Sequence, residues 1–145
     1  MSEKIPDFDA DGDLPPGIHH ISGEELWARF GNRGLQRTFV SECLRKIIDL
    51  ATISGKVERL IIFGSYVTKK PEPGDVDLLL IVSADFKIEE VHQEARILFD
   101  HQCAEREFNA HIFWLRNNVG RQVIDGFINV YATSRNGKLR GVIEL

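Results

Sequence analysis

Two aspartates separated by one residue, Asp75 and Asp77, are the residues whose type and spacing point most directly to chemistry. They open an apolar run at 76–82, rich in Leu, Ile and Val, which predicts a buried strand. Side chains alternate between the two faces of a strand, so both carboxylates point to one side, about 7 Å apart. Two like charges held there repel each other, and burying them without a partner is costly. The pair therefore predicts a site for a divalent cation that prefers oxygen ligands.

A glycine and a serine, Gly64 and Ser65, follow a second apolar run at residues 60–63. Glycine has no Cβ to keep an anion away from the backbone, and the serine hydroxyl and backbone N–H groups donate to such an anion. If the two runs pair as antiparallel neighbours, the Gly-Ser turn lies beside Asp75 and Asp77, whereas a parallel pairing needs a longer crossover. The sequence thus predicts an anion-binding turn next to a cation site.

Helical patterns precede and follow these two strands in the sequence, and the helices that they predict must position the strands. Ser22 and Glu25 have the spacing of a capping box and predict the start of a short helix. A longer helix is predicted from about residue 34 to Gly55, and Arg37 belongs to its polar face, which we expect to be solvated. The later patterns predict a helix that begins at Ser83 and has apolar positions as far as Phe99, a strand at 108–115, a helix at 121–131 and a terminal strand at 142–145, on the edge of a sheet.

These elements predict one domain of the α/β (α+β) class, in which a mixed sheet of three or more strands packs against helices. We place this domain at residues 21–145. Residues 1–20 are acidic, contain Gly and Pro and lack periodicity, which predicts a flexible or surface-draped arm. Aspartates occupy every second position from Asp7 to Asp13, but Gly12 and His20 do not fit the spacing of a calcium loop.

Composition and charge narrow the classes of protein further. The net charge of −4 argues against a protein that holds long nucleic acid by charge alone, although a nucleotide bound through a metal remains compatible. No apolar stretch approaches the roughly 18 residues of a membrane span, and the first residues lack the apolar core of a signal peptide. Cys43 and Cys103 lie in helical patterns without a metal-ligand cluster, which favours reduced thiols in a cytoplasmic protein.

The run at 63–65, Phe-Gly-Ser, and the run at 75–77, Asp-Val-Asp, together resemble the signature of the nucleotidyltransferase superfamily, the DNA polymerase beta-like proteins. The chain looks most like the small, single-domain members, the minimal nucleotidyltransferases. The stretch Leu-Pro-Pro-Gly-Ile-His near the start and Arg-Gly-Val-Ile near the end are similar to a less characterised branch of such proteins. The signature itself covers only residues 60–82, but the order of the surrounding elements fits much of the chain.

The resemblance implies a nucleotidyltransferase-like fold and the transfer of a nucleoside monophosphate, in the first place AMP from ATP, to a hydroxyl acceptor. It implies that Gly64 and Ser65 contact the nucleotide phosphates. It also implies that Asp75 and Asp77 hold Mg²⁺ or Mn²⁺, which bridges phosphate oxygens and aligns an in-line attack.

The third predicted strand departs from the family pattern. Active members carry a third carboxylate there, whereas the aligned residue here is His111, with Asn109 and Glu107 one and two same-face steps away. His111 is a candidate base or ligand, although Mg²⁺ prefers oxygen, and it is equally a candidate for a structural histidine beside the sheet. Lys69, in the loop between the first two strands, either meets phosphate charge or is a solvated loop lysine, and the same alternatives apply to Lys70.

Two functions follow from the resemblance, and they imply different partners. The first is a Mg²⁺-dependent enzyme that binds a nucleoside triphosphate and modifies a hydroxyl of a protein, a small molecule or an RNA end. The second is a catalytically weakened, nucleotidyltransferase-like binding protein, such as the antitoxin of a toxin–antitoxin pair, and the missing third carboxylate favours it. A third alternative is an α/β protein in which Asp75 and Asp77 cap a turn or pair with Arg59 or Lys69.

Overall fold

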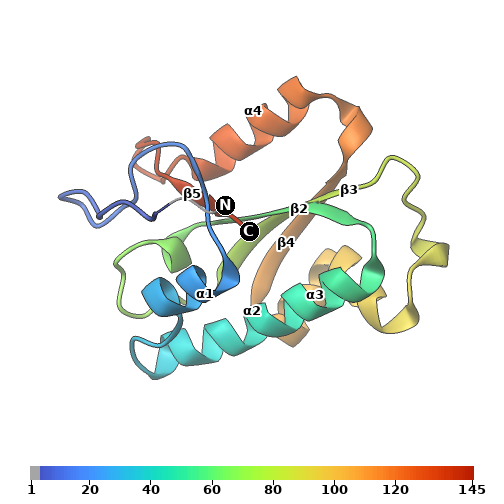
Figure 1. Ribbon diagram of the computed structural model, residues 1–145, viewed down its shortest axis with the longest axis horizontal. Coiled ribbons are helices and arrows are strands. Elements are labelled where there is room, and N and C mark those ends of the chain that lie inside the picture. The colour runs from blue at the N-terminus through green and yellow to red at the C-terminus, as the bar shows by residue number, and fades with distance from the viewer. Residues whose placement is uncertain (1–3) are drawn as a thin grey trace.

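The computed structural model describes residues 4–145, which form a five-stranded mixed sheet with helices on both faces (Figure 1). The strands are β1 Ile18–His20, β2 Val57–Phe63, β3 Val76–Val82, β4 Ala110–Arg116 and β5 Val142–Glu144. Their order in the sheet is β1-β5-β2-β3-β4. The pairs β1–β5 and β3–β4 are parallel, whereas β5–β2 and β2–β3 are antiparallel. The expected class, a mixed sheet packed against helices, is confirmed.

The α-helices divide between the two faces of the sheet. They are α1 Gly23–Leu26, α2 Leu35–Ser54, α3 His101–Phe108 and α4 Arg121–Ala132. Figure 1 shows α1, α2 and α3 on one face and α4 on the other. Successive strand residues enter different cores: Ile62 and Leu78 pack with the first group of helices, whereas Ile61 and Leu79 pack with Ile124 of α4. Burial on both faces explains why β2 and β3 read as continuous apolar runs.

The helix boundaries predicted before the sheet are largely confirmed. The Ser22 hydroxyl accepts the Glu25 N–H at 3.2 Å, and the Glu25 carboxylate accepts the Ser22 N–H at 3.3 Å, so the capping box is present. A turn of π-helix, Trp27–Gly31, continues from α1. Helix α2 ends at Gly55, as expected, and that glycine has left-handed backbone angles.

The two central strands pair as the sequence predicts. Strand β2 is antiparallel to β3, with Phe63 opposite Asp77, so the end of β2 lies beside the start of β3. Strand β4 runs parallel to β3, and its register places His111 opposite Asp77. The end of β2 and the starts of β3 and β4 therefore lie together at one end of the sheet.

The single helix predicted from Ser83 onwards is wrong. This segment contains two short 3₁₀ stretches, Ile88–Glu90 and Gln93–Phe99, before α3 begins. Phe86, Val91 and Ala95 form a separate small core with the end of β3, so the chain bends around that end. The side chain of Asp100 then accepts the Cys103 N–H at 3.0 Å and starts α3 as a new helix.

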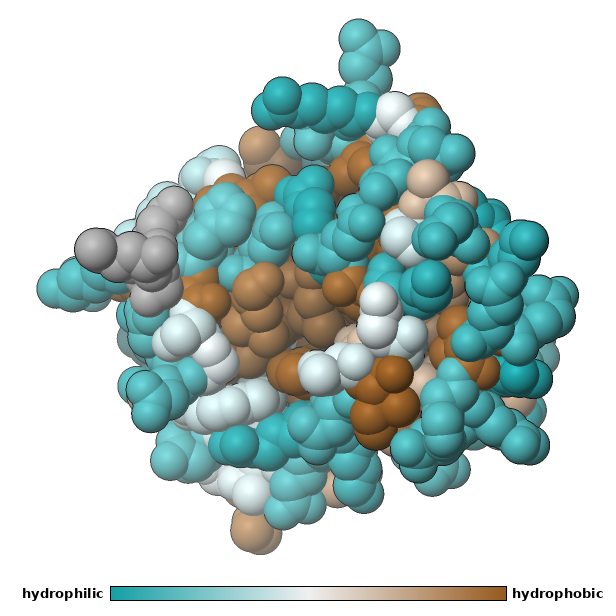
Figure 2. Space-filling view, turned by 45° about the vertical axis from the view of Figure 1, so that its right-hand side comes forward, coloured by the Kyte–Doolittle hydropathy of each residue, from teal (hydrophilic) through white to brown (hydrophobic). Residues whose placement is uncertain are grey.

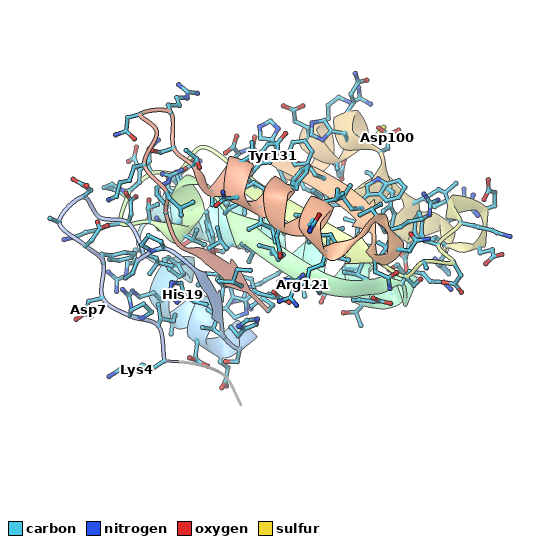
Figure 3. The ribbon with its side chains drawn as sticks, turned by 90° about the horizontal axis from the view of Figure 1, so that it is seen from above. Lys4, Asp7, His19, Asp100, Arg121 and Tyr131 are labelled. Carbon is cyan, nitrogen blue, oxygen red and sulfur yellow. The ribbon has the colours of Figure 1, made fainter. Side chains whose placement is uncertain are left out.

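The C-terminal strand was expected at a sheet edge, and this is also wrong. Strand β5 lies between β2 and β1, and β1 forms the edge. The backbone at Gly141, just before β5, approaches the N-terminal arm so closely that a Cβ at this position would overlap the carbonyl oxygen of Pro15. The Gly141 N–H donates to the Leu14 carbonyl at 2.9 Å. The arm is thus laid on the domain, and its last residues, including His19, join the sheet as β1 (Figure 3).

The surface gives no sign of a membrane-spanning helix in the described residues. None of the helices within 4–145 combines the length and apolar character that crossing a membrane requires. Figure 2 shows a face on which hydrophilic side chains predominate and apolar ones gather near the middle.

Candidate functional site

The turn after β2 brings the backbone of Gly64 against a side chain of β3. Gly64 has a φ of 83°, a left-handed value that favours glycine. A Cβ at this position would overlap the Oδ2 atom of Asp77. Ser65 then begins a 3₁₀ turn, Ser65–Val67, and both residues line the same cleft as the aspartates. Glycine at position 64 is therefore required for the turn to meet the carboxylate.

Asp75 and Asp77, which we call the cleft pair, lie with His111 at the end of the sheet where β2 ends and β3 and β4 begin. One ligand atom from each of the three residues lies within 4.8 Å of the others. The Nε2 atom of His111 is 3.0 Å from Asp75 Oδ2, at hydrogen-bonding distance. The two carboxylates point into one space, as the alternation of a strand predicts.

The cleft pair carries negative charge that His111 and Arg140 offset only in part. Burial, and secondly repulsion from Asp75, raises the pKa of Asp77 to about 6. Within residues 4–145, Asp75 forms an ion pair with His111 but neither aspartate forms one with a lysine or arginine. The pairing of Asp75 or Asp77 with Arg59 or Lys69 is therefore absent from the described residues, and Arg59 instead binds Glu144 at 2.8 Å. A site of two carboxylates whose negative charge is only partly offset fits a small divalent cation.

His111, which lies opposite Asp77 on β4, lies between the carboxylates of Asp75 and Glu105. His111 Nε2 faces Asp75, and its Nδ1 lies 3.6 Å from Glu105 Oε1 on α3. Glu107 is exposed on the same helix and does not line the cleft. Asn109 ends α3 in a left-handed conformation and donates its amide to the Gly74 carbonyl. Sequence reasoning missed Glu105, since only the fold brings α3 against β4.

The cleft has a volume of about 940 Å³, and its walls have opposite charges. Besides the cleft pair and the Gly-Ser turn, its lining includes two aspartates of the arm, Asp11 and Asp13, and four basic residues: Lys70, Arg135, Lys138 and Arg140. Arg135 lies in the turn at residues 135–137, and Lys138 and Arg140 follow that turn, so sequence reasoning did not connect them to the site. Lys69 is not among the lining residues, and its N–H donates to the Gly12 carbonyl at 2.8 Å. Lys70, one residue later, takes the place in the cleft considered for Lys69.

The loop that joins the Gly-Ser turn to the cleft pair depends on a buried arginine. Arg37 is only 2% exposed, so its expected place on a solvated face is wrong. Its guanidinium donates to four backbone carbonyls, at distances of 2.6–3.2 Å: those of Phe30, Tyr66, Thr68 and Lys70. Desolvation lowers the pKa of this guanidinium from its usual value. Arg37 lies three, four and seven residues before the buried Val40, Ser41 and Leu44, so it shares their face of α2. This spacing was the sequence feature that could have predicted its burial.

Three aspartates of the arm form a second acidic group, which we call the arm cluster, around Lys138. The Lys138 Nζ lies 2.8 Å from Asp9 and from Asp11, and 3.0 Å from Asp13. Hydrogen bonding to Lys138 is the main cause that lowers the pKa of Asp9. Bonds to Asp11 and Asp9 raise the pKa of Lys138 in turn. The place a metal ion would take in this cluster therefore holds an ammonium group.

Comparison with known proteins gives the chain a family. No curated protein and no solved structure matches it. One family model matches residues 6–145 and so includes the arm cluster, the cleft pair and the C-terminal strand. Its description is "Family of unknown function (DUF6932)". With a match over nearly its whole length, the chain belongs to the DUF6932 family.

Proposed function

We propose that this protein binds a nucleoside triphosphate with Mg²⁺ or Mn²⁺ and transfers the nucleoside monophosphate, AMP from ATP in the first place, to a hydroxyl acceptor. The observation that carries the proposal is the close approach of Gly64 to Asp77, which joins a Gly-Ser turn to two carboxylates in one cleft. The nucleotidyltransferase signature in the sequence gives the same assignment.

Each wall of the cleft has a part in this function. The cleft pair supplies carboxylate oxygens, the ligands that Mg²⁺ prefers, and a bound Mg²⁺ would neutralise phosphate charge. The Gly-Ser turn lets phosphate oxygens approach the backbone, and Lys70 and Arg140 add positive charge on the same cleft. In the transfer, the acceptor oxygen would bond to the α-phosphorus, the bond to pyrophosphate would break, and the hydroxyl proton would pass to solvent water.

His111 would position the metal ligands in this scheme. Its Nε2–H donates to one oxygen of Asp75 and so restricts the orientation of that carboxylate. A histidine at the place of a third carboxylate leaves the site with two acidic ligands, one fewer than the resemblance leads us to expect.

The test is calorimetric titration with ATP in the presence of Mg²⁺ or Mn²⁺, followed by incubation of the protein and a cell lysate with labelled ATP. The wild type should bind ATP only with the metal and label an acceptor. Asp77→Ala should lose both activities, whereas Asp85→Ala, an exposed aspartate outside the cleft, should retain them. Metal-dependent binding that Asp77→Ala leaves intact would contradict the assignment of the site.

The histidine at position 111, where active relatives of the resembled family carry a third carboxylate, favours a second function, that of a weakened binding protein such as an antitoxin. In this case the protein would form a stable complex with a partner protein, and the complex would persist in the Asp75→Ala, Asp77→Ala double variant. Co-purification with the product of a neighbouring gene measures this directly. A complex that the double variant disrupts, or labelling of the partner by the wild type, would favour the enzyme.

A further inference from the structure

Three side chains from α3 and β4 form a group of which the proposed function uses only His111, and of that residue only Nε2. His101 and Glu105 lie four residues apart on α3, so they occupy the same face of that helix. His111 faces them from β4, and its ring centroid lies 5.9 Å from that of His101. One ligand atom from each residue lies within 4.8 Å of the others. Figure 3 labels Asp100, which precedes His101, on the side of the molecule away from Asp7 of the arm.

The hydrogen bond of His101 determines which of its nitrogens is available. His101 Nδ1 lies 3.1 Å from the carbonyl oxygen of Ile112. A carbonyl only accepts, so the proton belongs to Nδ1 and the lone pair to Nε2. An outer acceptor on one histidine nitrogen, with the other nitrogen left free, is the usual arrangement of histidines that bind metals.

The contacts of His111 lead to the same result on the other ring. Its Nε2 lies 3.0 Å from Asp75 Oδ2, and an ionised carboxylate accepts, so this nitrogen carries a proton. Nδ1 then directs its lone pair toward Glu105 Oε1, 3.6 Å away. Two acceptors facing each other need a cation between them, either a proton on Nδ1 or a metal ion. The arm cluster meets the same need with the ammonium of Lys138, but no lysine or arginine of the described residues pairs with Glu105.

We propose that His101 Nε2, His111 Nδ1 and the Glu105 carboxylate bind a divalent transition-metal ion of the Zn²⁺ class. Two imidazoles and one carboxylate suit Zn²⁺, whereas Mg²⁺ prefers the all-oxygen cleft pair. Metal–ligand distances of about 2.1 Å place the ligands of a tetrahedral site roughly 3.4 Å apart, so ligand atoms that now lie within 4.8 Å of one another would move closer together around the ion. His101 and Glu105 are exposed, which leaves the ion a path of entry and a fourth position for water.

This site is separate from the proposed nucleotide function, although His111 connects the two. The imidazole binds the transition metal through one nitrogen and orients Asp75 through the other. Binding at the Zn²⁺ site therefore stiffens the orientation of Asp75 but does not require Asp77.

The experiment uses untagged full-length protein, because a histidine tag binds the same metals, and excess Mg²⁺ to occupy the cleft pair. Zn²⁺ affinity is measured by competition with a chromogenic chelator, and Co²⁺ absorption reports the ligand geometry. The variants are His101→Gln and Glu105→Gln, both at exposed positions. The control is His92→Gln, which removes another exposed histidine near a glutamate, Glu94.

We expect one Zn²⁺ per chain in the wild type and an affinity at least about tenfold weaker in His101→Gln and Glu105→Gln, since even an outer partner contributes 10- to 100-fold. His92→Gln and Asp77→Asn should match the wild type. Asp77→Asn also separates the two proposals, because it should lose Mg²⁺-dependent nucleotide binding and keep Zn²⁺. No stoichiometric Zn²⁺ binding, or binding that His101→Gln and Glu105→Gln leave unchanged, would overturn the site.

Discussion

The arm cluster and the cleft pair contain the same residue type at the same spacing, yet their electrostatic surroundings are opposite. In the arm cluster, an ammonium group lies within 3.0 Å of three carboxylates and lowers the pKa of Asp9. In the cleft pair, burial and mutual repulsion raise the pKa of Asp77 to about 6. The first group has a cation of the chain at its centre, whereas neither aspartate of the second pairs with a lysine or arginine of residues 4–145.

This difference shows why alternating aspartates alone do not identify a metal site. Lys138 lies 129 positions from Asp9 in the sequence, and the fold brings them together. The same pattern therefore serves to tie down the arm in one place and, by our proposal, to hold a metal ion in the other. Five variants test this comparison.

The most severe variant, Arg37→Met, removes the support of the loop between the Gly-Ser turn and the cleft pair. Four carbonyls lose a charged donor, so we expect the free energy of unfolding to fall by about 3–5 kcal/mol. Urea denaturation measures the change. Arg33→Met, at an exposed position of the same region, should change stability by less than about 0.5 kcal/mol. A loss below about 1 kcal/mol for Arg37→Met would show that the loop does not depend on these bonds.

Gly64→Ala should displace a side chain of the cleft pair directly. The new Cβ meets Asp77 Oδ2, and alanine is strained at a φ of 83°, so we expect a loss of about 2–3 kcal/mol and displacement of the carboxylate. Thermal unfolding with and without Mg²⁺ measures both effects. Gly74→Ala is the matched control, because a Cβ there meets open space. Equal stability of the two variants would show that the turn tolerates a Cβ beside Asp77.

Asp77→Asn should make the metal-free protein more stable. An unfolded aspartate loses its proton near pH 4, whereas folded Asp77 keeps it to about pH 6. The folded state thus binds more protons between these values, and its stability falls as the pH rises through them. With screening by solvent considered, Asn should add about 1–2 kcal/mol at pH 7.5 and nothing near pH 4.

The matched variant in the arm cluster should behave in the opposite way. Because the pKa of Asp9 is lowered, its carboxylate stabilises the fold above the pKa of the unfolded state, and this contribution is lost on acidification. Asp9→Asn should therefore be less stable than the wild type at neutral pH. Denaturation curves from pH 4 to 7.5 compare the two variants, and changes of the same sign would refute the contrast.

Lys138→Ala should have the smallest effect, and it makes the arm cluster resemble the cleft pair. Three carboxylates lose their common cation, so we expect a modest decrease in melting temperature that Ca²⁺ reverses. The wild type should show no such response at the arm, because the ammonium occupies the position. Thermal melts with and without Ca²⁺ distinguish the two cases, and identical responses would mean that Lys138 does not exclude the metal.

The features found from the sequence depend on short-range patterns. The apolar runs predicted β2 and β3, and the short loop between them predicted the antiparallel pairing that brings Gly64 to Asp77. The register that sets His111 opposite Asp77 agrees with the position aligned for a third carboxylate. The place of β5 could not be predicted in the same way, because three residues carry little pattern and the pairing depends on distant segments.

The sequence by itself determined the two central strands, the glycine at the turn and the two acids on one side of a strand. These follow from side-chain alternation and from the reach of a short loop. The tertiary structure alone decided which charges are neutralised: it placed Lys138 in the arm cluster, Arg37 beneath the loop and Glu105 beside His111. Electrostatic interactions act through space at a few ångströms, and the fold, rather than chain order, sets those distances.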